Sequence, residues 1–215
     1  MSSPRLPLLA CAVLGLAVIL PASGAAPGRP ASIQARLMSC DPGTVRAATE
    51  AVLNDPATQT EPAALFQAAL AERMAGSKEQ AAFLYLAARL RMSRQALVAH
   101  EEARQALGAL VVTISPLIMP DLLADPGLTR RAVARTADWD RATPDPFRDV
   151  ALAKGAEFSA RLVELDAAMA RLPRDLQAKA GADHPALLAE AERQLAAMRE
   201  ARCAPATVGG AVTRH

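Results

Sequence analysis

Residues 60–94 read TEPAALFQAALAERMAGSKEQAAFLYLAARLRMSR, and this stretch decides the fold. Apolar residues recur at helical spacing on both sides of Gly76, in residues 65–74 and again in residues 83–90. Gly76 is placed to end the first helix, because glycine adopts the left-handed conformation that closes a helix. Ser77 follows at once as a candidate cap for the second helix. The stretch therefore predicts two antiparallel helices joined through one glycine.

Two details at the helix starts support this prediction. Thr60 is expected to cap the first helix, with Pro62 in its first turn. The amide that proline lacks would have no hydrogen-bond partner in the first turn of a helix. Gln80 stands three residues after Ser77, which is the spacing of a capping box.

The second predicted helix resembles the second helix of a tetratricopeptide repeat. In that repeat two small residues let the helices approach, and an aromatic residue between them fills the remaining space. The matching positions here are Ala81, Tyr85 and Ala88. Glu72 and Ser93 depart from the repeat pattern, and no second copy matches it. The resemblance covers residues 61–94 and implies one helical hairpin with similar packing, not a repeat domain.

The rest of the chain also favours helix. The 215 residues are 52% hydrophobic but only 3% aromatic, and strands favour β-branched and aromatic residues. Asp41-Pro42 and Asp125-Pro126 have the cap-then-proline pattern of a helix start. Residues 158–172 carry an apolar heptad stripe. We expect an all-α domain over residues 40–204, an irregular helical bundle of six to eight short-to-medium helices.

The part of the chain after the hairpin contains predicted helix starts, an apolar run and a loop. Ser93 is predicted to cap a new helix that enters an apolar run, residues 106–119, where Pro116 should kink the helix. The run is too short to span a bilayer, and it is a candidate lining for a cavity. Residues 139–149 hold the only tryptophan, several charges and two prolines, and they predict a loop. Asp183 is predicted to cap the last helix.

Residues 1–26 have the three parts of a secretory signal peptide. Arg5 supplies positive charge, residues 6–20 form an apolar core, and small residues follow. We expect cleavage near residues 24–26 and a periplasmic or secreted protein. Acylation of Cys11 as a lipoprotein is the alternative, but most of the apolar core follows this cysteine, whereas a lipoprotein cysteine follows the core.

Two cysteines remain after the signal peptide. Cys40 precedes the first expected helix and Cys203 follows the last, so a disulfide would join the two ends of the domain. An oxidising compartment favours this bond over two separate thiols or an intermolecular bond. Residues 27–39 are expected to form a flexible leader, and residues 205–215 a disordered tail.

The charges exclude some functions. Lys and Arg number 24 against 22 for Asp and Glu, so the chain lacks the basic excess that nucleic-acid binding requires. His100 begins a sequence similar to the zinc-protease motif, but Arg104 stands where its second histidine would be. We expect no metal, no cofactor, no catalytic constellation and no stable membrane span after signal cleavage.

Aromatic and charged residues gather in two parts of the chain and form a candidate interaction surface. Its members are Tyr85, Arg89, Arg91, Arg94, Trp139, Asp140, Asp145 and Arg148. The arginines would suit an anionic ligand or the carboxylates of a partner. They would equally suit Asp140, Asp145 and Asp149, clamping the expected loop onto the hairpin. The near balance of charges favours this internal clamp.

These features favour an exported, non-enzymatic protein that binds a protein or peptide partner in the cell envelope. A helical bundle that binds a small molecule or lipid is the alternative, with residues 106–119 lining its cavity. An enzyme that uses carboxylates of residues 139–149 is the second alternative.

Export gives a direct prediction. When the full chain is expressed in a bacterium, the product outside the cytoplasm should lack about the first 24–26 residues, because signal peptidase cuts after small residues. Intact-mass spectrometry measures the cut. Leu14→Arg, which places a charge in the apolar core, is the control and should keep the chain uncut. An exported product that retains Met1, or an acylated Cys11, would disprove the prediction.

Overall fold

The computed structural model describes residues 32–179 and 184–204. Within these ranges 88% of the residues are helical and there is no strand, so the all-α prediction is confirmed. The predicted signal peptide with Cys11, the predicted tail at 205–215 and the predicted cap Asp183 lie outside the described residues.

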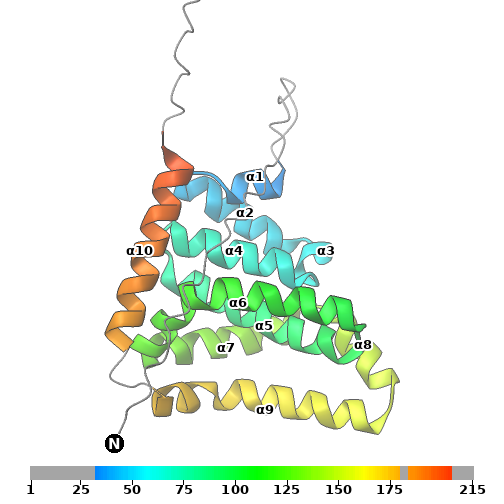
Figure 1. Ribbon diagram of the computed structural model, residues 1–215. Coiled ribbons are helices and arrows are strands. Elements are labelled where there is room, and N and C mark those ends of the chain that lie inside the picture. Colours follow the sequence, from blue (N-terminus) through cyan, green and yellow to red (C-terminus); the bar gives the residue numbers. More distant parts are fainter. Residues whose placement is uncertain (1–31, 180–183, 205–215) are drawn as a thin grey trace, which may run out of the picture. The chain divides into compact units, whose positions relative to one another are not determined.

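The described residues form ten helices that pack together, eight of them with seven or more residues (Figure 1). In chain order they are α1 Ile33–Leu37, α2 Pro42–Asn54, α3 Pro56–Gln59, α4 Pro62–Met74, α5 Lys78–Val98, α6 Glu101–Ala124, α7 Pro126–Ala142, α8 Pro146–Ala153, α9 Ala156–Lys179 and α10 His184–Cys203.

One local rule starts four of these helices. Before α2, α3, α7 and α8 an aspartate precedes a proline, and its side chain accepts hydrogen bonds from backbone amides of the first turn. The proline costs nothing there because its missing amide would have no partner. These caps are Asp41, Asp55, Asp125 and Asp145.

The predicted hairpin is formed by α4 and α5. Gly76 has a φ of 91°, a left-handed conformation that a side chain would strain, and it turns the chain between the helices. Tyr85 is fully buried, and its ring meets Phe66 of α4 edge-on, with 5.8 Å between ring centroids. The aromatic residue therefore fills the space between the two helices.

Two expected caps of the hairpin do not form. Thr60 ends α3, and Glu61 precedes Pro62 at the start of α4 without a side-chain cap. Ser77 does stand before α5, but its side chain makes no cap hydrogen bond, so the capping box with Gln80 is absent. Burial of the helix faces orders this turn without side-chain caps.

Helix α5 is the central element of the fold. Its buried residues lie all around the helix, and it contacts α4, α6, α7, α8 and α9 (Figure 1). A helix that is apolar on every side must be covered on every side. These five helices therefore cover α5 on all sides.

The predicted start of a helix at Ser93 is wrong. Ser93 lies inside α5, and the break comes at Ala99 and His100. Glu101 and Glu102 then occupy the first turn of α6, where carboxylates interact favourably with the helix dipole. This acidic pair was the signal for the true boundary.

Helix α6 is one helix of 24 residues that contains both Pro116 and Pro120. Four buried apolar residues support it across these prolines: Ile114, Leu117, Ile118 and Leu122. By length and composition α6 would be able to cross a membrane, a property that it shares with core helices of globular domains. Its buried side belongs to the core of the bundle.

The loop expected at 139–149 is much shorter. Trp139 and Asp140 belong to the last turns of α7, and α8 starts at Pro146. Only residues 143–145 connect the two helices. Asp145-Pro146 repeats the cap-then-proline pattern and begins α8.

The leader expected to be flexible contains α1. Ser32 caps this short helix, and Leu37 is buried. Helix α1 contacts α2 and α4, so packing of its apolar residues orders a segment that small residues and prolines had suggested to be flexible.

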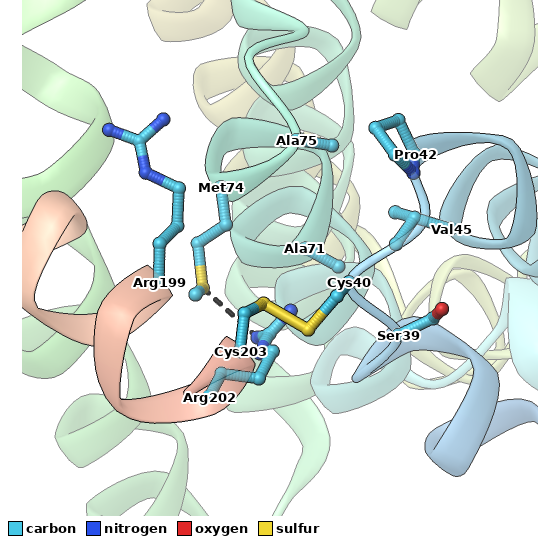
Figure 2. Close-up of a pocket in the computed structure, with 10 residues that line it drawn as sticks. All are labelled: Ser39, Cys40, Pro42, Val45, Ala71, Met74, Ala75, Arg199, Arg202 and Cys203. Carbon is cyan, nitrogen blue, oxygen red and sulfur yellow. Dashed lines mark hydrogen bonds between the residues drawn. A yellow bond between two sulfur atoms is a disulfide. The ribbon is translucent and has the colours of Figure 1, made fainter. Parts of the chain in front are cut away.

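The disulfide between Cys40 and Cys203 is present, with 5.8 Å between the Cα atoms (Figure 2). It joins the residues just before α2 to the end of α10. Helix α10 also packs on α4 and α6. There Arg73 of α4 binds Asp121 of α6 and Glu192 of α10, so an ion cluster and a covalent bond together hold α10.

Removal of the disulfide should lower stability without changing the fold. Its loop spans 163 residues, and the chain-entropy model gives a loss of about 4–5 kcal/mol for a loop of this size. Urea unfolding of the exported Cys203→Ser protein measures the loss. The Cys40→Ser/Cys203→Ser double variant is the control, since reductant should destabilise the native protein but not this variant. Equal sensitivity of both proteins to reductant would contradict the prediction.

Candidate functional site

Two buried arginines of α5 are the centre of an ion cluster. Arg91 and Arg94 are 0% and 1% exposed. Nη1 of Arg94 donates to Asp140 at 2.6 Å and to Asp145 at 2.7 Å. Nη1 of Arg91 lies 3.0 Å from Asp145, and Arg148 also binds Asp140. The internal clamp is therefore formed by the ends of α7 and α8 against α5.

Further contacts extend the cluster. The Arg91 guanidinium lies over the Trp139 ring, 4.7 Å from its centroid, and donates to Thr143 Oγ1 at 2.6 Å. Arg94 also binds Asp166 of α9. Asp149 is exposed and forms no ion pair with the described residues, so it takes no part in the clamp. The arginines of α5 thus fix α7, α8 and α9.

The cluster does not favour acid–base chemistry. Burial alone would raise the pKa of Asp145, but the charge of Arg91 and the hydrogen bond from Arg94 outweigh burial and lower this pKa below its ordinary value. A general acid near neutral pH needs the opposite shift. The enzyme hypothesis therefore gains no support from Asp145.

The proposed interaction surface is not an open surface. Tyr85, Arg91, Arg94, Asp140 and Asp145 are buried, whereas Arg89, Trp139 and Arg148 are partly buried. Six of these eight residues gather in the ion cluster, and Tyr85 and Arg89 lie apart from it. Buried charges need partners, and pairing within the chain takes the four buried ones, Arg91, Arg94, Asp140 and Asp145, out of a partner's reach.

Tyr85 and Arg89 border a pocket between α5, α6 and α9. Its volume is about 360 Å³. Leucine and methionine side chains supply most of its wall, and the polar groups are few. The lining residues are Tyr85, Leu86, Arg89, Leu90 and Ser93 of α5, Met119 of α6, and Leu165, Ala168, Met169, Leu172, Leu176 and Lys179 of α9.

A hydrogen-bonded pair fixes the polar part of this wall. The Tyr85 hydroxyl lies 2.6 Å from Ser115 Oγ of α6, and it accepts a hydrogen bond from Arg89 Nη1 at 3.2 Å. The apolar run at residues 106–119 was a candidate lining for a cavity, and from this run Met119 lines the present pocket. Ser115 of the same run orients Tyr85. The heptad stripe of residues 158–172 indicated an apolar face on α9 but not what that face would enclose.

Other hollows are less suited to a ligand. One at α4 and α6 has about 400 Å³ and includes Ala106 and Leu110, but it opens more widely and has few large apolar side chains. Another, of about 220 Å³, adjoins the disulfide (Figure 2). There Arg202 donates to Met74 Sδ at 3.0 Å and to the Leu37 carbonyl at 3.4 Å, contacts that hold α10 against the rest of the fold.

Comparisons with family models, curated proteins and solved structures found no match to this chain. Among residues 32–179 and 184–204, no group of three or more metal-binding side chains comes together. The pocket between α5, α6 and α9 is therefore the candidate site, on its geometry alone.

The ion cluster predicts a severe effect of one substitution. Arg94→Met leaves Asp140 and Asp145 buried with one cation fewer, and loss of one partner of a buried pair costs about 3–5 kcal/mol. Urea unfolding at neutral pH measures the change. Arg130→Met, which alters an exposed arginine of α7, is the control and should change stability by less than about 0.5 kcal/mol. Similar losses in both variants would show that the cluster does not have this role.

Proposed function

We propose that the protein is an exported, non-enzymatic binding protein that holds a small molecule with an apolar body between α5, α6 and α9. The observation that carries this proposal is the pocket itself. Its volume of about 360 Å³ falls within the usual range for small-molecule sites, about 300–1,000 Å³. Its wall combines many apolar side chains with a few oriented polar groups, as such sites generally do.

The two sides of the pocket differ in rigidity. Helix α5 is enclosed by its neighbours, whereas Leu162 and Leu176 are the buried residues of α9. Met119 and Met169 face the pocket from α6 and α9, and methionine adapts easily to the shape of a ligand. The pocket therefore has one fixed wall and one wall that can adjust.

Export belongs to this proposal. The disulfide supports an oxidising compartment, since such bonds persist outside the cytoplasm. The signal-peptide pattern of residues 1–26 points to the same compartment. The ligand would therefore be a molecule that is present in the cell envelope or outside the cell.

The sequence first favoured binding of a protein or peptide. The positions of the residues assigned to that interaction surface now give this hypothesis less support. The residues assigned to that surface either pair within the core or border the pocket. Because the pocket is suited to a compact apolar molecule, it favours the small-molecule hypothesis.

A substitution that fills the pocket tests the proposal. Ala168 lines the pocket at its solvent-exposed edge, whereas Ala170, equally exposed on the same helix, lies outside the pocket. The native protein should bind the neutral dye N-phenylnaphthylamine saturably, with a rise in dye fluorescence. Ala168→Trp should weaken this binding at least roughly tenfold, because the indole occupies the space of the dye. Ala170→Trp should leave it unchanged.

Thermal unfolding of both variants serves as the stability control. Absence of saturable binding to the native protein would overturn the proposal. Equal weakening by both tryptophans would show that the dye binds elsewhere, which also overturns it.

A further inference from the structure

We infer that the ligand of this pocket is an anionic amphiphile whose carboxylate binds Arg89 while its apolar chain lies between α5 and α9. The inference rests on the proposed function and adds the chemical class of the ligand. Its basis is the position and pairing of Arg89, which differ from those of the other arginines nearby.

Arg89 is partly buried and borders an apolar space. One of its nitrogens donates to the Tyr85 hydroxyl at 3.2 Å, and its guanidinium lies 5.9 Å from the centroid of the same ring. No carboxylate of residues 32–179 or 184–204 forms a salt bridge with it. A guanidinium has five N–H donors, so Arg89 retains donors for a ligand.

The contrast with its neighbours is informative. Arg91 and Arg94, two and five residues further along α5, are paired with Asp140 and Asp145. Asp140 and Asp145 come from α7 and from the start of α8, which cover another side of α5, and Arg94 also binds Asp166 of α9. Arg89 instead faces the side of α5 covered by α9, where the adjoining residues are apolar. An anion that enters there would pair with a partly buried cation that has no carboxylate partner among the described residues and that adjoins apolar side chains.

A carboxylate suits this position better than a larger anion. A single guanidinium binds the two oxygens of a carboxylate with two parallel hydrogen bonds. Tyr85, held by Ser115, keeps the Arg89 side chain in place, so little side-chain freedom is lost on binding. Ser93, one turn further along α5, adds a hydroxyl on the same side of the pocket.

The apolar chain of the ligand has a defined place. Leu86 and Leu90 of α5 face Met169 and Leu172 of α9 across the pocket. Arg94 and Asp166 join the same two helices beyond Ser93 and limit the pocket at that end. Lys179, the last residue of α9, borders the pocket as a second cation and is exposed. It is the competing site for the carboxylate and is therefore included in the test.

Three probes with one alkyl chain separate charge from hydrophobicity. Decanoate, decanol and decylamine are each used to displace N-phenylnaphthylamine from the native protein, with decanol below its solubility limit and the two ionic probes below their micelle concentrations. Decanoate should bind about tenfold more tightly than decanol, and decylamine should bind less tightly than decanol, because Arg89 attracts only the anion. Isothermal titration calorimetry with decanoate gives an independent affinity.

Matched variants assign the effect to a residue. Arg89→Met should remove the preference for decanoate and leave decanol binding unchanged. Arg130→Met, at an exposed arginine of α7 away from the pocket, should keep the full preference. If Lys179→Met removes the preference and Arg89→Met does not, the assignment to Arg89 is wrong.

Failure of this inference is distinguishable from failure of the proposed function. Equal affinities for decanol and decanoate, with both blocked by Ala168→Trp, would overturn the anionic class and leave small-molecule binding intact. If the native protein binds neither the dye nor, by calorimetry, decanoate, both the inference and the proposed function are overturned.

Discussion

Pairing of Arg91 and Arg94 with Asp140 and Asp145 constrains the arrangement of the helices around α5. Charges this deeply buried are tolerated only when partners compensate for the lost hydration. The partners are close in sequence but belong to two helices, because Asp140 lies near the end of α7 and Asp145 caps α8. The short connection at 143–145 must therefore stay against α5. This constraint places α8, and then α9, on one side of the central helix.

The pocket is a consequence of that placement. Helix α9 follows α8 after one break at Gly155, which has a φ of 107°, and Asp166 binds Arg94 from it. The ion pair and the apolar stripe lie on the same helix, so α9 is held beside α5 without being buried. One arginine of α5 remains outside the cluster and borders the enclosed space. The buried charges thus support the fold, and Arg89 is the arginine of α5 that lines the pocket.

Helix α10 is held in a different way. The Cys40–Cys203 bond joins its end to the start of α2, and Arg73 links it to α4 and α6 through Asp121 and Glu192. The hydrogen bond from Arg73 lowers the pKa of Glu192 below its ordinary value, as expected for a carboxylate that is stabilised in the folded state. Such a bond persists in compartments where no reducing system maintains free thiols, and it is consistent with the proposed export.

The sequence by itself determined the helices whose signals lie within one turn of the chain. Asp41-Pro42, Asp125-Pro126 and Gly76 act through backbone bonds and local sterics, so they predicted helix ends without knowledge of the packing partner. The same pattern at Asp145-Pro146 lies within the segment for which the sequence predicted a loop. The disulfide could also be predicted, since Cys40 and Cys203 are the two cysteines that follow the predicted signal peptide. Tertiary structure alone decided that α5 passes through Ser93, which burial on all sides makes possible, and that the heptad stripe of α9 forms the wall of a pocket. A helical period shows that a face is apolar, but the contacts that cover it are long-range and leave no local trace.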